Sequence, residues 1–311
     1  MPEQIPPQVE PASLESGPTL PEFSEVHPDN AEDITAILPR QIVTAEAVGQ
    51  TDVGRDRHHN EDFFVIKHRL DYQSDPRQRV TSFKGLYILC DGMGGHAKGE
   101  VASALAAETL VEQLGSLETV NSACLETAIL AANQAIYAAN ESKQGRTHQD
   151  RMGTTLVLCV IEDSQVHFAH VGDSRMYALT SSRGLEQLTV DHEVGQQEIQ
   201  RGVDPAVAYR RPDAYQLTQA IGPRRDREVS PDINEFTITE DTLLLLCSDG
   251  LTDNGLLETH AATHLVPLLR EEVELQQGVS QLVNLANQYN GHDNVTVLAI
   301  RIKAHPQPPS G

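Results

Sequence analysis

Acidic residues flank the apolar runs of this sequence that are long enough to form buried strands. They are Glu61, Asp62, Asp91, Asp249 and Asp293, with Asp173 at the end of a further run. A buried carboxylate without a partner costs several kcal/mol, so such residues normally face a cation, a helix N-terminus or hydrogen-bond donors. Because neighbouring strands of one sheet lie about 4.8 Å apart, acids at the same end of adjacent strands would lie close together. The pattern predicts a cluster of carboxylates that needs cations.

The donor atoms in this pattern are oxygens. Carboxylates, water and the carbonyl of a glycine such as Gly92 suit hard ions such as Mg²⁺ or Mn²⁺. Two such ions that share a water would lower its pKa and direct it at a phosphorus atom. Each acid alone is also compatible with a helix cap or a surface position; Asp91, for example, could cap a helix that begins near Lys98. The recurrence of the pattern favours the metal site.

The cysteines argue against a zinc site, and the overall charge argues against nucleic acids and anionic membranes as partners. Cys90, Cys124, Cys159 and Cys247 stand far apart, without the spacing of a zinc site, so we expect reduced, buried thiols. The formal net charge is −22, whereas nucleic acids and anionic membranes require basic surfaces. No run approaches the roughly 20 apolar residues of a membrane span, and no signal peptide is recognisable. We therefore expect a cytoplasmic protein that binds neither nucleic acid nor membrane.

Composition divides the chain into three parts. Residues 1–40 contain eight prolines and eight acidic residues against one arginine, which is typical of a disordered segment. Residues 41–303 show no repeat and no linker-like break, and predict one domain. Residues 304–311 are rich in proline, and we expect a flexible tail.

Hydrophobic periodicity predicts the elements of the domain. Apolar spacings of three and four predict two helices, 99–114 and 117–140, packed as an antiparallel pair on a sheet. Four runs separated by short polar turns predict an antiparallel meander: 154–161, 165–171, 175–179 and 185–188. The less regular stretch 191–222 predicts a helical insertion at the rim of the site. The remaining predicted elements are a strand at 242–247, helices at 262–275 and 279–289, and a strand at 295–300.

Seven short motifs resemble, in order, those of the protein phosphatase 2C family, the metal-dependent serine/threonine phosphatases, in its bacterial branch. They are RxxNED (57–62), DGMGGH (91–96), MGTT (152–155), VGDSR (171–175), LTQAIG (217–222), SDGLTD (248–253) and GHDNVT (291–296). One motif alone would be weak evidence, but seven in order over nearly all of the domain are highly specific. The resemblance implies an α+β fold: a central sandwich of two antiparallel β-sheets flanked by helical pairs, in four αββα layers, with a flap insertion at about 191–222.

The resemblance also implies a binuclear Mn²⁺ or Mg²⁺ centre. Asp91 would bridge the two ions. Asp249 and Asp293 would complete the first site, and Glu61 and the carbonyl of Gly92 would complete the second.

Further roles follow from the same resemblance. Asp62 would act on the second site through water, and Asp173, with Asp249, matches the position of a third, weaker metal in bacterial members. Arg57 would clamp the phosphate, a role that suits a planar guanidinium. Met93 stands where animal members carry the histidine proposed as general acid. His96, just beyond two glycines, is a candidate for that role, or else a helix cap or a contact for the substrate protein.

The function implied is that of a monomeric protein serine/threonine phosphatase in signalling, acting on phosphorylated proteins that include targets of Ser/Thr kinases. Two alternatives use the same residues. A two-metal phosphodiesterase or nuclease would hydrolyse phosphate diesters. A catalytically inactive phosphoprotein-binding module should have lost at least one ligand, whereas every expected ligand is present.

Overall fold

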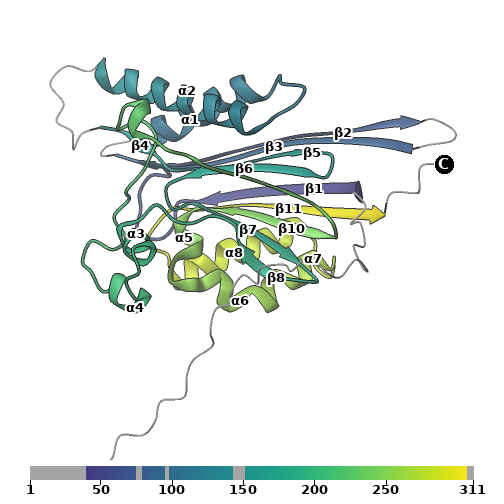
Figure 1. Ribbon diagram of the computed structural model, residues 1–311. Coiled ribbons are helices and arrows are strands. Elements are labelled where there is room, and N and C mark those ends of the chain that lie inside the picture. The colour runs from purple at the N-terminus through teal and green to yellow at the C-terminus, as the bar shows by residue number, and fades with distance from the viewer. Residues whose placement is uncertain (1–39, 75–78, 95–97, 143–150, 307–311) are drawn as a thin grey trace, which may run out of the picture. The chain divides into compact units, whose positions relative to one another are not determined.

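The computed structural model describes residues 40–74, 79–94, 98–142 and 151–306. They form two antiparallel sheets that lie face to face (Figure 1). In the first sheet the strand order is β1 (Arg40–Asp52), β11 (Val295–Pro306), β10 (Thr242–Cys247), β7 (Arg175–Thr180) and β8 (Gly184–Gln187). In the second sheet it is β2 (Asp62–Ser74), β3 (Arg79–Met93), β5 (Leu156–Glu162), β6 (Gln165–Val171) and β9 (Asp232–Thr237), with β4 (Gly153–Thr154) paired to β3.

Helices cover the outer face of each sheet (Figure 1). The second sheet is covered by α1 (Lys98–Leu114) and α2 (Ser122–Glu141), and the first by α6 (Leu256–His264), α7 (Val266–Leu269) and α8 (Leu275–Tyr289). The flap insertion carries α3 (Val194–Gln200) and α4 (Pro205–Ala208), at the same end of the sandwich as β4 and the short helix α5 (Asp249–Thr252). The expected α+β sandwich is confirmed.

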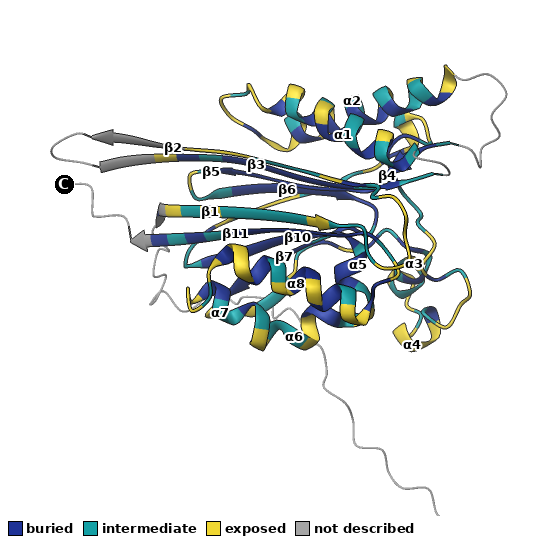
Figure 2. Cartoon of the chain, turned by 180° about the vertical axis from the view of Figure 1, so that it is seen from behind, coloured by how far each residue is buried: buried dark blue, intermediate teal, exposed yellow. Residues whose placement is uncertain are grey.

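Three apolar layers hold these elements together, as the buried strands and the buried inner faces of the helices show (Figure 2). Leu110 and Ile129 belong to the layer under α1 and α2, Tyr87 and Leu244 to the layer between the sheets, and Leu282 to the layer under α8. All five side chains are fully buried. Burial of the apolar side chains in the three layers is the main favourable contribution to folding.

The four cysteines are free, but the expectation that all of them are buried holds for only three. Cys90, Cys159 and Cys247 are buried, one in each apolar layer, while Cys124 is half-buried. Desolvation raises the pKa of each buried thiol, so these side chains behave as small apolar groups. No helix of the described residues is long and apolar enough to cross a membrane.

The predicted four-stranded meander is wrong. β5 and β6 pair in the second sheet, whereas β7 and β8 pair in the first, so the chain crosses between the sheets at residues 172–174. Gly172 has a φ of +114°, and the hydroxyl of Ser174 lies 2.7 Å from that of Thr155. Turn residues in a sequence reveal that a strand ends, but not which sheet the next strand joins.

Three element boundaries also differ from the prediction. The predicted helix 262–275 instead begins at Leu256 and ends at His264. It does not continue to residue 275 because Pro267 has no amide hydrogen, and only the short α7 follows. The second helix of the antiparallel pair begins at Ser122, where the Asn121 side chain accepts a hydrogen bond from the Cys124 amide at 3.0 Å. β11 continues to Pro306, into the segment expected to be a tail. Residues 1–39 and 307–311 lie outside the described residues.

Gly172→Ala should lower the free energy of unfolding by about 2 kcal/mol or more. A Cβ at this position would lie 2.6 Å from the Cβ of Thr155, and the positive φ disfavours any L side chain. Urea denaturation measures the change. Gly202→Ala is the matched control, because Gly202 has a φ of +91° with no atom near its Cβ position and should cost only about 1 kcal/mol. Equal losses in the two variants would show that contact with Thr155 does not constrain the crossing.

Candidate metal centre

Acidic side chains from both sheets meet at one end of the sandwich. Asp91 lies near the end of β3 in the second sheet, while Asp249 follows β10 and Asp293 precedes β11 in the first. With Asp173, from the crossing between the sheets, they line a pocket of about 270 Å³. The prediction that these acids come from neighbouring strands of one sheet is therefore only partly right: most of the cluster forms because both sheets end at the same place.

Asp62 lies behind the pocket rather than in its wall. It pairs with Asp91 in the β2–β3 register, and its side chain is 7% exposed. Its Oδ2 accepts hydrogen bonds from Ser248 Oγ at 2.9 Å and from Thr296 Oγ1 at 2.6 Å, whereas its Oδ1 is buried without a partner among the described residues. Burial raises the pKa of Asp62 to about 6, although the two hydroxyl groups oppose the rise.

The pKa values of Asp91, Asp173 and Asp249, in the pocket wall, are raised as well. Desolvation, followed by the charges of Asp62 and Asp249, raises the pKa of Asp91 well above its usual value. Desolvation and then Asp173 raise the pKa of Asp249 in the same way, and Asp249 Oδ1 is buried without a partner among the described residues. The pKa of Asp173 is raised to about 6, by desolvation and then by Asp191. These groups cannot all ionise together unless cations neutralise them.

Carboxyl groups that line one pocket and raise one another's pKa suit hard divalent cations. Mg²⁺ and Mn²⁺ take oxygen ligands from carboxylates, carbonyls and water, and the described residues that line this pocket include no histidine or cysteine. The residues present therefore fit such ions.

Glu61 and Gly92 form the side of the pocket next to α1. The Gly92 amide donates to the carbonyl of Glu61 at 3.0 Å, and the Gly99 amide, in the first turn of α1, donates to Glu61 Oε1 at 3.2 Å. A Cβ on Gly92 would lie 2.2 Å from the Gly99 carbonyl oxygen. Only glycine allows β3, α1 and the loop before β2 to approach this closely, which places the Gly92 carbonyl beside the Glu61 carboxyl group.

Asn294 positions the loop that carries Arg57 and Glu61, and the sequence reasoning missed it. Its side-chain oxygen accepts from the Glu61 amide at 2.8 Å, and its Nδ2 donates to the carbonyls of Val53 at 2.8 Å and His59 at 2.9 Å. The residue is 4% exposed. A signal was available, because Asn294 follows Asp293 in one of the recognised motifs, but its partners lie more than 230 positions earlier in the chain.

Arg57 forms an ion pair with one of the acids. Its Nη2 donates to Asp293 Oδ2 at 2.6 Å, with 46% of the Arg57 side chain and 23% of the Asp293 side chain exposed. Burial alone would lower the pKa of Arg57, but Asp293, aided by Glu61 and Asp91, raises it. Guanidinium has five donors, so most of them remain available to an anion in the pocket.

The proton donor is not identified by this geometry. Met93 lines the pocket, and its thioether has no proton to give. His96 lies outside the described residues, so its role as general acid or cap stays a prediction.

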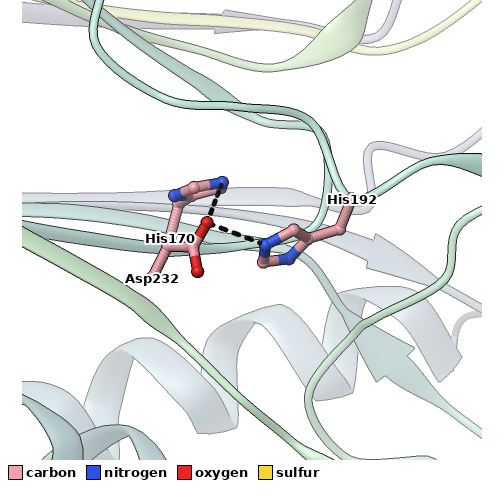
Figure 3. Close-up of side chains that lie close together, drawn as sticks. All are labelled: His170, His192 and Asp232. Carbon is pink, nitrogen blue, oxygen red and sulfur yellow. Dashed lines mark hydrogen bonds and ion pairs between the residues drawn. The ribbon is translucent and has the colours of Figure 1, made fainter. Parts of the chain in front are cut away.

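A second cluster, His170, His192 and Asp232, joins the base of the flap to β6 and β9 (Figure 3). His192 Nε2 lies 3.3 Å from Asp232 Oδ2, and His170 Nε2 lies 4.0 Å from it. The rings stack with centroids 4.6 Å apart, and desolvation lowers the pKa of His170. Three such side chains can bind a transition metal.

The hydrogen bonds of this cluster involve the two Nε2 atoms that face Asp232. The Gly172 amide donates to His192 Nδ1 at 3.1 Å, so a neutral His192 carries its proton on Nε2, the atom that faces Asp232. His170 Nε2 lies 2.8 Å from the Val190 carbonyl and must donate to it. Neither Nε2 then has a lone pair for a metal. The cluster instead fixes the flap to the sheet.

Protein stripped of divalent cations should become less stable as the pH rises from about 4 to above 6. Unfolded carboxyl groups ionise near their usual pKa. In the folded state those of Asp62 and Asp173 hold their protons to about pH 6, and the pKa values of Asp91 and Asp249 are also well above their usual value. The folded state therefore binds more protons in this window, so each rise in pH costs stability. Thermal unfolding in a chelator measures the slope.

Asp173→Asn should reduce that slope, and added Mn²⁺ should raise the melting temperature more above pH 7 than at pH 5. Stability that rises across this window in the chelated protein would contradict the assigned shifts.

Comparison with known proteins identifies the family. The model of the family described as Protein phosphatase 2C matches residues 47–295. The serine/threonine phosphatase stp of Listeria monocytogenes is 35% identical over 81% of this chain and 93% of its own length, and protein phosphatase PhpP of Streptococcus pneumoniae is 31% identical over 80% and 94%. The solved structure of the Mycobacterium tuberculosis serine/threonine phosphatase PstP/Ppp superimposes with a TM-score of 0.67 at 29% identity, covering 83% of this chain and 99% of the other. A further PstP structure, of the catalytic domain in complex with two manganese ions, gives a TM-score of 0.63 at 29% identity, covering 83% and 98%. The chain belongs to the protein phosphatase 2C family.

Proposed function

We propose that this protein is a metal-dependent protein serine/threonine phosphatase that removes phosphate from phosphoserine and phosphothreonine. The observation that carries the proposal is the pocket in which Asp91, Asp249 and Asp293 from two sheets face Arg57. The carboxylates of this pocket favour the binding of cations, and Arg57 beside them can then bind a phosphate. The relatives' names support this reaction class, since each is called a phosphatase.

In this proposal the residues divide between two ion sites. Asp91 would serve both ions, Asp249 and Asp293 would hold the first, and Glu61 and the Gly92 carbonyl would hold the second. Two Mn²⁺ or Mg²⁺ ions bound there would neutralise the carboxylates and lower the pKa of a shared water molecule. The two manganese ions in the PstP catalytic domain support a count of two.

Three further residues act around these ions. Asp62, which accepts hydrogen bonds from Ser248 and Thr296, would act on the second ion site through water. Asp173, which lines the pocket near Asp249, is proposed for a third, weaker ion. Arg57 holds the phosphate and orients it toward the water.

The cellular setting is part of the proposal. We infer that the substrates are phosphoproteins in the cytoplasm, including targets of Ser/Thr kinases, and that the protein acts as a monomer in which residues 41–303 form the catalytic domain.

Asp91→Asn should lower kcat/KM on a phosphothreonine peptide by about 10³-fold or more, and Asp293→Asn by roughly 10², because only Asp91 serves both ions. Removal of divalent ions with EDTA should abolish turnover in the wild type, and Mn²⁺ should restore it. Asp56→Asn is the control, since Asp56 is an exposed acid in the same loop as Arg57 but does not line the pocket.

A loss in Asp293→Asn far exceeding that in Asp91→Asn would refute the bridging role. Turnover in excess EDTA would refute the metal-dependent reaction. Hydrolysis of phosphate diesters but not of phosphopeptides would favour the phosphodiesterase alternative.

Arg57→Ala should raise KM about tenfold with a smaller change in kcat, because the guanidinium binds the phosphate in the ground state as well as in the transition state. Arg57→Lys should recover only part of the loss, since an ammonium cannot form the two parallel hydrogen bonds of a guanidinium. Arg55→Ala controls for the removal of a nearby positive charge, because Arg55 bonds to the Asn287 carbonyl and does not line the pocket. Wild-type KM with reduced kcat in Arg57→Ala would contradict the clamp.

A further inference from the structure

A second pocket, of about 500 Å³, lies beside α2 and is lined mainly by arginines. Its charged lining consists of Arg151, Arg224, Arg225, Arg227, Glu141 and Glu228. The whole chain has 23 basic residues against 45 acidic ones, so four arginines around one pocket reverse the overall charge locally. Guanidinium groups bind carboxylate and phosphate oxygens through paired hydrogen bonds.

The backbone that carries three of these arginines is fixed to α2. Asn133 donates to the Arg224 carbonyl at 3.1 Å and to Asp226 Oδ1 at 2.6 Å, and its own side-chain oxygen accepts from the Gly222 amide at 2.6 Å. Asn140 donates to the Gly222 carbonyl at 3.1 Å. Both asparagines are buried, so the arginines project from a rigid segment.

Two of the arginines meet at Tyr137. Arg225 Nε donates to the Tyr137 hydroxyl at 3.2 Å, and the Arg151 guanidinium carbon lies 5.0 Å from the ring centroid. Hydrogen bonds from Arg225 and then Arg151 lower the pKa of this tyrosine, against desolvation and the charge of Glu141. Arg151 also pairs with Glu141 and donates to the Pro223 carbonyl at 3.0 Å, so Arg151 and Arg225 use part of their hydrogen-bonding capacity within the pocket.

The other two arginines keep most of their donors. Arg224 is exposed and uses Nη1 to donate to the Thr218 carbonyl at 3.1 Å. Arg227 is exposed and makes no hydrogen bond or ion pair with any residue that the structure describes. An incoming oxyanion would find free guanidinium donors here.

Two sets of contacts connect this pocket to the metal centre. Gly94 lines the metal centre, and a Cβ on it would lie 3.4 Å from the Cα of Met152, the residue that follows Arg151. Leu217 also lines the metal centre, and the next residue accepts the hydrogen bond from Arg224. A peptide with one residue in the metal centre can therefore reach the arginines with a residue a short distance along its chain.

We infer that the arginine pocket binds a second anionic side chain of the same substrate protein, so that the enzyme prefers phosphosites with a neighbouring phosphorylated or acidic residue. The inference rests on the proposed phosphatase function and specifies its substrates. The second anion is held but not hydrolysed, because the two acids among the described lining residues, Glu141 and Glu228, are exposed and do not form a buried cluster like that of the metal centre.

The test is a panel of phosphothreonine peptides in which one other position is serine, glutamate or a non-hydrolysable phosphonate analogue of phosphoserine. That position is moved along both sides of the phosphothreonine, so only one phosphate can be released from any peptide. At the best position, the phosphonate should raise kcat/KM about tenfold over serine, through KM, and glutamate should raise it less. High salt should reduce the preference, because the site is exposed.

Arg224→Ala/Arg227→Ala should bring the ratio between phosphonate and serine peptides close to one. Arg183→Ala/Arg270→Ala is the matched control, because it removes two exposed arginines that do not line either pocket and should keep the preference. Equal turnover of all peptides by the wild type, or a preference that survives in Arg224→Ala/Arg227→Ala, would overturn the inference while leaving the phosphatase function intact. Absence of turnover on every peptide, including the serine ones, would instead remove the phosphatase function and the inference with it.

Discussion

Repulsion among desolvated carboxyl groups is the constraint on which this structure depends. Asp62, Asp91, Asp173 and Asp249 all have raised pKa values, and burial is the first cause in each. A fold that only had to be stable would not gather them, because every like charge added to a desolvated site costs free energy. The cost is offset when cations bind, so the same contacts that weaken the metal-free protein make the site selective for divalent ions.

The fold keeps this arrangement rigid through hydrogen bonds from residues that do not line the pocket. Ser248 and Thr296 hold Asp62 from the first sheet, so the two sheets cannot slide at this end without breaking buried hydrogen bonds. Asn294 holds the loop that carries Arg57 in the same way. Stability of the sandwich and geometry of the site are therefore coupled, and a variant of these hydroxyl or amide groups should affect both.

The sequence predicted several strands and the residues that could bind a metal. It did not predict which strands pair or which distant residues meet in the fold. The apolar runs gave the bounds of β6 and β10 correctly, and strand-end acids pointed to cations. The crossing at Gly172 and the contribution of both sheets to the cluster were missed, because periodicity carries no information on which strands pair. Asn294 and Ser248 were missed as positioning residues for the same reason: their partners are remote in sequence, and only the folded chain brings them together.

The central claim is that Asp91 joins two ions into one centre. Electron paramagnetic resonance of the Mn²⁺-loaded protein tests this directly, because two ions that share a bridging ligand couple magnetically. We predict the signal of a coupled pair at two ions per chain, replaced in Asp91→Asn by the spectrum of isolated ions, while Asp56→Asn keeps the coupled signal. A wild-type protein that shows only isolated Mn²⁺ at saturation would contradict the account.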